Sequence, residues 1–164
     1  MEIQDDGPTD FDIHHNFTVS GTALVPHTYG LNVSWVARAL SGAPFSLTNG
    51  AIDPDLNGIQ AEPIAAGDYT GVGTDPYTVK SYESKRNGAR GPGFFNLDMR
   101  FGYRIPIAKQ RRVEIAADVF NLTNHTNFAV PAGNQNAPAT FLVFTAYNTS
   151  YAPRKVQIGA RIQF

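Results

Sequence analysis

This chain has few of the residues that most often bind transition metals or take part in nucleophilic catalysis, since its 164 residues include four histidines and no cysteine. The lack of Cys excludes a disulfide scaffold, a cysteine zinc site and thiol catalysis. His14 and His15 are adjacent, so in a strand they point to opposite faces and cannot share a metal ion. His27 and His125 fall in a predicted turn and a predicted loop. No GxSxG, P-loop or HExxH motif is present, and we expect neither a cofactor nor an enzyme.

One acidic segment has the spacing of a calcium loop. In DPDLNGIQAEPI, the residues Asp53, Asp55, Asn57 and Gly58 stand at positions 1, 3, 5 and 6 of such a loop. Oxygen ligands at alternate positions can converge on one cation, and Gly permits the sharp turn. Position 12, however, is Ile64 in place of the required Glu. The pattern favours a polar turn, with calcium binding as the alternative.

Many of the remaining charged residues alternate with apolar ones. The segment FFNLDMRFGYRIPI has period two, as expected of a strand whose side chains point alternately to opposite faces. One row is apolar and the other polar or charged. The apolar row is Phe95, Leu97, Met99, Phe101, Tyr103 and Ile105, and the other row is Asn96, Asp98, Arg100, Gly102 and Arg104.

The same alternation predicts five strands, at about 11–25, 30–47, 93–106, 112–122 and 153–164. No apolar row contains Asp, Glu, Lys or Arg, which is what a lipid-facing surface requires. Short turns, PHTY and IAKQ, alternate with long loops at about 49–92 and 123–152 that are rich in Gly, Pro, Asn and Thr. An all-β antiparallel meander of long strands with these connections is typical of a transmembrane β-barrel.

A soluble β-sandwich shows the same alternation and is the alternative interpretation. It would act as a carbohydrate- or ligand-binding module, with Trp35, Tyr69, Tyr77 or Tyr82 as stacking platforms. A loop of about 44 residues would be long for a compact soluble domain. The net charge of −1 excludes a nucleic-acid binder that works through bulk positive charge.

Four segments carry a family resemblance: SGAPFSL, RNGARGPGFFNLDMRFGYR, VEIAADVFNLTNHTNF and the final PRKVQIGARIQF. Together they make the chain resemble the C-terminal part of TonB-dependent receptors of the bacterial outer membrane, in particular the Oar-like subfamily. The most specific feature of the resemblance is that VFNLTNHTNF occurs together with a terminal strand of alternating apolar residues that ends in Phe.

The resemblance implies that residues 11–164, after a lead-in at 1–10, are the C-terminal part of a 22-stranded barrel with a plugged lumen. The function implied for the parent receptor is energised uptake of a ligand across the bacterial outer membrane. The implied partners are the rest of the barrel and its plug, outer-membrane lipid, the outer-membrane assembly machinery and, through missing N-terminal parts, the TonB complex. No nucleic-acid partner is implied.

The charges also predict a strand register. Strands 93–106 and 112–122 should form a hairpin in which paired residue numbers sum to about 218. Arg100 then lies opposite Asp118, and Arg104 opposite Glu114, because opposite charges across strands stabilise and like charges destabilise. We expect both ion pairs to line the lumen.

The end of the chain is expected to serve as an assembly signal. Apolar side chains occupy every second position of the last strand, and these are Val156, Ile158, Ala160, Ile162 and Phe164. By the same resemblance, a terminal aromatic residue on such a strand is read by the assembly machinery. The simpler role for Phe164 is to anchor the strand in an aromatic girdle, and both roles can coexist.

Overall fold

A computed structural model describes residues 6–28, 30–50, 53, 56, 58, 61–108, 111–148 and 152–163. Asp55, Asn57 and Phe164 lie outside the described residues. The described part is all-β, with eleven strands and no helix. It therefore contains no helix long and apolar enough to cross a membrane.

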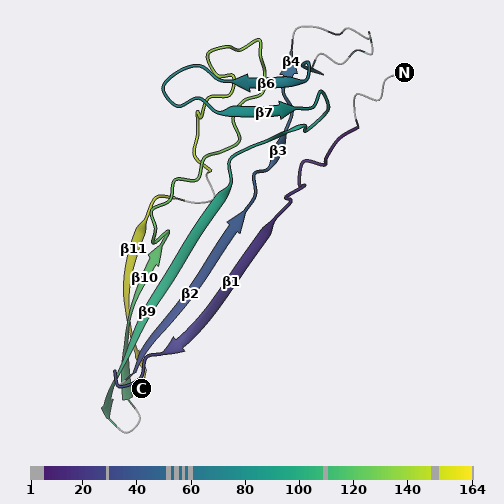
Figure 1. The fold of residues 1–164 in the computed structure, drawn as a ribbon. Coiled ribbons are helices and arrows are strands. Elements are labelled where there is room, and N and C mark those ends of the chain that lie inside the picture. Colours follow the sequence, from purple (N-terminus) through teal and green to yellow (C-terminus); the bar gives the residue numbers. More distant parts are fainter. Residues whose placement is uncertain are drawn as a thin grey trace. The chain divides into compact units, whose positions relative to one another are not determined.

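The main element is a five-stranded sheet with strand order β1-β2-β9-β10-β11 (Figure 1). Its strands are β1 (Asn16–Leu24), β2 (Leu31–Leu40), β9 (Phe94–Ala108), β10 (Arg111–Phe120) and β11 (Lys155–Gln163). β10 pairs antiparallel with β9 on one side and with β11 on the other. All five predicted strands are present, but the sheet is open and does not close into a barrel.

Two predicted strands are shorter than their alternation indicated. The strand expected at 11–25 begins at Asn16, because the preceding residues form turns in which Asp12 N–H bonds to the Thr9 carbonyl and Ile13 N–H to that of Phe11. The strand expected at 30–47 ends at Leu40. There the chain passes Gly91 so closely that a Cβ on Gly42 would lie 1.8 Å from the Gly91 oxygen.

The ends of the other three strands shift by a few residues. β9 continues past 106 to Ala108, and the β9–β10 register shifts between Arg111 and Arg112. Arg112 pairs with Pro106, which has no N–H to donate, so an irregularity in the ladder is expected there. β10 ends at Phe120, because Asn121 adopts a left-handed backbone with a φ of 50°.

The long loops contain short strands of their own. These are β3 (Pro44–Phe45), β4 (Thr48–Asn49), β5 (Glu62–Pro63), β6 (Gly67–Thr70), β7 (Thr78–Tyr82) and β8 (Ala89–Arg90). They pair as β3–β8, β4–β5 and β6–β7. The segment YTVKSYES contains β7, the second strand of a small hairpin with β6. The turn lies earlier, between Thr70 and Thr78.

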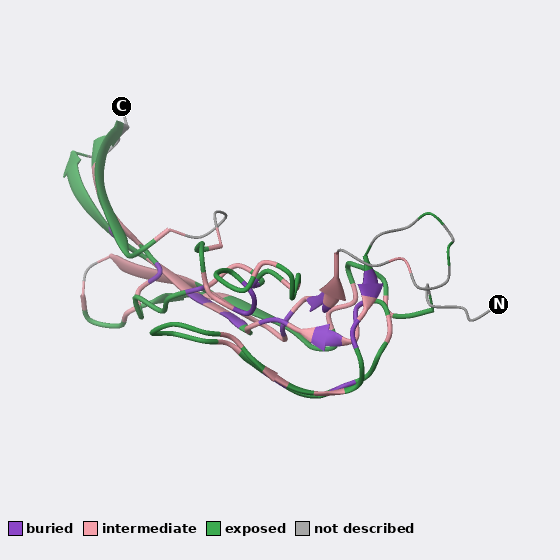
Figure 2. Ribbon diagram, turned by 90° about the horizontal axis from the view of Figure 1, so that it is seen from above, coloured by how far each residue is buried: buried purple, intermediate pink, exposed green. Residues whose placement is uncertain are grey.

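The chain divides into two compact units. One, the loop unit, comprises residues 1–15, 40–94 and 127–149; the other, the sheet unit, comprises 16–39, 95–126 and 150–164. The loop unit holds the apolar core: Phe45, Leu47, Ile64, Val79, Tyr82, Ala89, Phe141 and Leu142. Figure 2 shows buried segments in the loop unit, whereas the described part of β11 is exposed throughout.

Candidate functional site

The charged face of the sheet unit has the register expected from its charges. Asp118 lies opposite Arg100 and Glu114 opposite Arg104, which confirms the predicted pairing. Arg100 Nη1 lies 3.1 Å from both carboxylate oxygens of Asp118, so this is a hydrogen-bonded ion pair. Arg104 Nε lies 3.9 Å from Glu114 Oε2, which is a looser contact. That these pairs line a lumen stays a prediction.

Strand β11 extends this face. Arg161 lies opposite Glu114, so this carboxylate stands between two arginines of neighbouring strands. One row further along, Gly102, Ala116 and Gly159 are paired across β9, β10 and β11. Small residues in this row leave room beside the arginine side chains.

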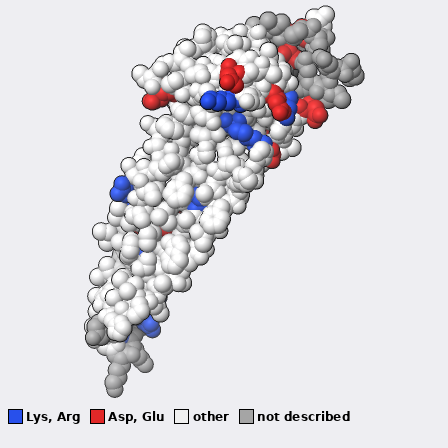
Figure 3. Space-filling view, in the orientation of Figure 1, with Lys and Arg blue, Asp and Glu red and all other residues white. Residues whose placement is uncertain are grey.

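The opposite face is apolar and largely exposed. Val156, Ile158 and Ile162 of β11 are 63%, 75% and 57% exposed. On β1 and β2, a Cβ on Gly21 would lie 2.4 Å from the Trp35 ring, so Trp35 lies over this glycine. Figure 3 shows one view in which the surface of the strands carries few charged atoms. A sheet with one apolar and one charged face separates a hydrocarbon phase from an aqueous one.

The Arg100–Asp118 pair can be tested by a double-mutant cycle. We expect a coupling free energy of about 0.2–1 kcal/mol between Arg100→Met and Asp118→Asn, because the arginine is half exposed. The measurement is urea denaturation of the protein folded in lipid vesicles. Exchanging the two residues should restore most of the stability lost in either single variant. Additive single effects and no recovery on exchange would contradict the ion pair.

Asn121 ties three strand ends together just after β10. Its N–H donates to Asp98 Oδ1 on β9 at 2.8 Å. Its side-chain amide donates to the carbonyls of His125 (3.0 Å) and Ala152 (3.3 Å), and its Oδ1 accepts from His125 N–H at 3.0 Å. Asn121 is 3% exposed. The VFNLTNH motif therefore closes this corner of the sheet with an asparagine whose hydrogen-bonding groups are used and whose backbone is left-handed. The sequence alone indicates no role for this residue.

Substitutions of Asn121 should separate the contribution of its side-chain hydrogen bonds to stability from that of its left-handed backbone. Asn121→Ala is expected to destabilise the fold by roughly 3 kcal/mol, because the His125 and Ala152 carbonyls lose their donor and alanine disfavours the left-handed backbone. Asn121→Gly loses the same hydrogen bonds without the backbone penalty and should cost about 1 kcal/mol less. Urea denaturation of both variants measures the difference. Equal stability of the two would argue against backbone strain at this position.

A cleft of about 290 Å³ opens beside this corner. β9 contributes Asn96 and Asp98, β10 contributes Phe120, and β11 contributes Lys155. Residues 121, 152 and 153 complete its wall. All of its lining residues belong to the sheet unit.

The tyrosines considered as sugar-stacking platforms are part of the core of the loop unit. Tyr82 is 2% exposed and donates from its hydroxyl to the carbonyls of Leu47 and Lys85. Burial raises the pKa of Tyr82, and also that of Tyr77, whose hydroxyl donates to the Arg90 carbonyl. Tyr69 packs edge-on against Tyr82. Tyr82 is thus buried in the core, and Tyr69 and Tyr77 are half-buried against it.

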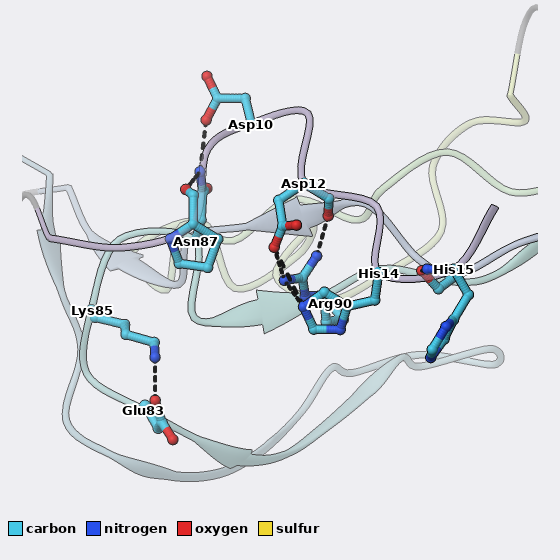
Figure 4. Close-up of polar contacts among 10 residues, drawn as sticks. Asp10, Asp12, His14, His15, Glu83, Lys85, Asn87 and Arg90 are labelled. Atoms are coloured by element: carbon cyan, nitrogen blue, oxygen red, sulfur yellow. Dashed lines mark hydrogen bonds and ion pairs between the residues drawn. The ribbon is translucent and has the colours of Figure 1, made fainter.

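Two acidic residues hold the N-terminal segment to the rest of the loop unit (Figure 4). Asp10 accepts from Asn87 Nδ2 at 2.7 Å and from Arg86 at 3.2 Å. Asp12 forms an ion pair with Arg90, whose guanidinium also donates to the Asp12 carbonyl. The ring of His14 lies against the same guanidinium. Hydrogen bonds from Asn87 and Arg90 lower the pKa values of Asp10 and Asp12 respectively.

Acid should release this segment. A carboxyl group whose pKa is lowered by folding stabilises the fold above its unfolded pKa, and this contribution is lost as the pH falls through the lowered value. We therefore expect residues 6–15 to loosen reversibly below the ordinary Asp value of 3.8. A spin label on Phe11→Cys, which is 92% exposed in a cysteine-free chain, would report this as increased mobility. In an Arg90→Gln background the label should already be more mobile at neutral pH. Unchanged mobility down to pH 2 would be the contrary result.

No group of three or more His, Asp or Glu residues suited to a metal ion occurs among the described residues. Asp53 Oδ2 accepts from Gly58 N–H at 2.9 Å, the bond of a polar turn. Asp55 and Asn57, the other calcium candidates, lie outside the described part, so calcium binding stays untested. His14 and His15 have ring centroids 6.4 Å apart and do not converge on one point. His125 packs edge-on against Phe95.

Comparison with known proteins identifies the family. A family model described as an outer membrane beta barrel domain matches residues 2–157, which span both compact units. No curated protein and no solved structure matches the chain. The match favours the membrane interpretation over the soluble β-sandwich and accounts for the exposed apolar face. The chain therefore belongs to the outer membrane beta barrel domain family, and the protein is located in the outer membrane.

Proposed function

We propose that this chain is the C-terminal barrel portion of a TonB-dependent receptor of the Oar-like kind. Such a receptor takes up a ligand across the outer membrane, and the TonB complex of the inner membrane drives the uptake. The observation that carries the proposal is the open five-stranded sheet, with ion pairs on one face and an uncharged apolar row on the other. Five strands are too few for a transmembrane barrel, which in bacterial single-chain examples has at least about eight. In this proposal, the remaining strands of the barrel belong to the rest of a 22-stranded receptor.

The connections between the strands support a large receptor. β2 and β9 are joined by more than fifty residues, which make up most of the loop unit and contribute short strands and most of its core. Long extracellular loops of this kind accompany ligand binding in outer-membrane barrels, whereas periplasmic turns are short. The motifs RNGARGPGFFNLDMRFGYR and VEIAADVFNLTNHTNF, by which the chain resembles these receptors, contain most of β9 and β10, the four residues of the ion pairs and Asn121.

In this proposal the chain has no catalytic role and no cofactor. It contributes barrel wall, two extracellular loops and the strand that guides assembly. Its partners are the other barrel strands and the plug on the charged face, and lipid on the apolar face. The assembly machinery acts during insertion, and the TonB complex acts through segments N-terminal to this chain.

Affinity purification from cells tests the proposal. Gly73 has a φ of 107°, and a Cβ there would meet nothing within 4 Å, so an affinity tag inserted at this loop position should be tolerated. We expect the tagged protein, extracted from outer membranes in detergent, to retain the soluble periplasmic domain of TonB. An outer-membrane porin with the same tag is the control and should retain none. A heat-modifiable barrel that retains no more TonB than the porin would refute the transporter proposal.

A further inference from the structure

The cleft at the Asn121 corner is a second feature of the charged face. It lies where β9, β10 and β11 are adjacent in the sheet, and its volume of about 290 Å³ suits a small ligand. Pockets for drug-sized molecules usually range from about 300 to 1,000 Å³. The volume of this cleft lies just below that range, so its ligand should be small.

Two charged groups of the cleft remain available to a ligand. The side chain of Asn121 is occupied by His125 and Ala152, and Asn96 is only 6% exposed. Asp98 uses one carboxylate oxygen to accept from Asn121 N–H. In the part of the chain that the structure describes, the side chain of Lys155 forms no hydrogen bond or ion pair.

These two charges stand on either side of an aromatic ring. Lys155 is paired with Phe120 across β10 and β11. Asp98 precedes Met99, which is paired with Val119, so Asp98 falls in the same row on β9. Neighbouring strands lie about 4.8 Å apart, which separates the backbones of Asp98 and Lys155 by about 10 Å. Phe120, 44% exposed, lies between them in this row and lines the cleft.

We propose that this cleft binds a short zwitterionic peptide, with the peptide ammonium group on Asp98, its carboxylate on Lys155 and its apolar middle on Phe120. An extended chain spans at most about 3.3–3.6 Å per residue, so three residues match the spacing of about 10 Å. A simple anion would meet the carboxylate, and a simple cation the ammonium group. A neutral sugar would find few uncommitted amide groups, because Asn121 is fully engaged. The inference goes beyond the transport proposal and does not depend on it.

Equilibrium dialysis tests the ligand class. The protein is extracted from outer membranes in a non-ionic detergent, because a zwitterionic detergent would compete, and is dialysed against radiolabelled trialanine. We expect saturable binding, and at least about tenfold weaker binding of trialanine with an acetylated N-terminus or an amidated C-terminus, since each loses one charge-assisted contact. Free alanine, which cannot span the two charges, should also bind more weakly. No saturable binding up to about 10 mM, or equal binding of the end-blocked peptides, would overturn the proposal.

Matched variants locate the binding. Asp98→Asn keeps an oxygen to accept from Asn121 N–H but removes the charge, and Lys155→Gln removes the other charge. Each should weaken trialanine binding by about tenfold. The controls are Asp75→Asn and Lys80→Gln, exposed residues of the loop unit that should leave binding unchanged. Heat-modifiable migration checks that each variant is folded. Unaltered affinity in both cleft variants would place the peptide elsewhere and refute the assignment. TonB retention is measured separately, so the two proposals fail independently.

Discussion

An arginine at position 158 is expected to destabilise the assembled protein by about 2–4 kcal/mol, the cost of placing this side chain on the lipid face near the bilayer midplane. Ile158 lies in the middle of β11, opposite Ala117, and is 75% exposed. Its exposed surface is apolar in a protein of the outer membrane, so lipid is its natural environment. The measurement is urea denaturation in vesicles, with the fraction of heat-modifiable protein as a second readout.

The neighbouring position provides the control. Gln157 lies opposite Asp118 on the charged face, so Gln157→Arg places the same side chain beside a carboxylate. We expect a change within about 0.5 kcal/mol, as for surface substitutions in general. Both variants place an arginine on the same strand at nearly the same depth. The two arginines lie on opposite faces of the sheet. Equal losses in both would show that β11 does not separate lipid from water as argued.

The strands could be predicted from sequence because period two is a local property. A residue in β9 shows by its own type which face it occupies, and the register with β10 follows from four charges. The strand ends could not be predicted in the same way. Residues 11–15 continue the alternation, yet Asp12 is held by Arg90, 78 positions away in the chain, and the backbone turns there instead of pairing.

The loop unit and the Asn121 corner were less accessible to sequence reasoning. Strands of two residues, such as β3 and β8, have no periodicity to detect, and they pair because Phe45 and Ala89 are buried in the same core. The tyrosines resembled sugar-binding platforms, since residue type alone does not reveal that Tyr82 is buried. Asn121 resembled any other polar loop residue. Its role depends on Asp98 and Ala152, which the chain brings together only when β9, β10 and β11 align.

Removal of Phe164 is expected to abolish most assembly of the protein in the outer membrane. Phe164 lies outside the described residues, but the strand that leads to it is described: Ile162 lies opposite Val113, Ala160 opposite Ile115 and Val156 opposite Val119. β11 pairs with β10 along one edge, and its other edge has no partner among the described strands. The backbone groups of that edge are therefore available to an added strand. The alternating apolar side chains then fix which face meets lipid.

Three variants distinguish a signal from a girdle anchor. Deletion of Phe164 and Phe164→Asp should both reduce heat-modifiable protein in the outer membrane strongly, because the assembly machinery would lose the aromatic end that it reads. Phe164→Leu keeps an apolar side chain and removes only the aromatic ring. If the residue is a signal, Phe164→Leu should also assemble poorly, whereas a simple apolar anchor would tolerate it. Wild-type levels of folded protein in the deletion and Phe164→Asp variants would leave the girdle as the only role, because the alternating residues from Val156 to Ile162 would then suffice to direct assembly.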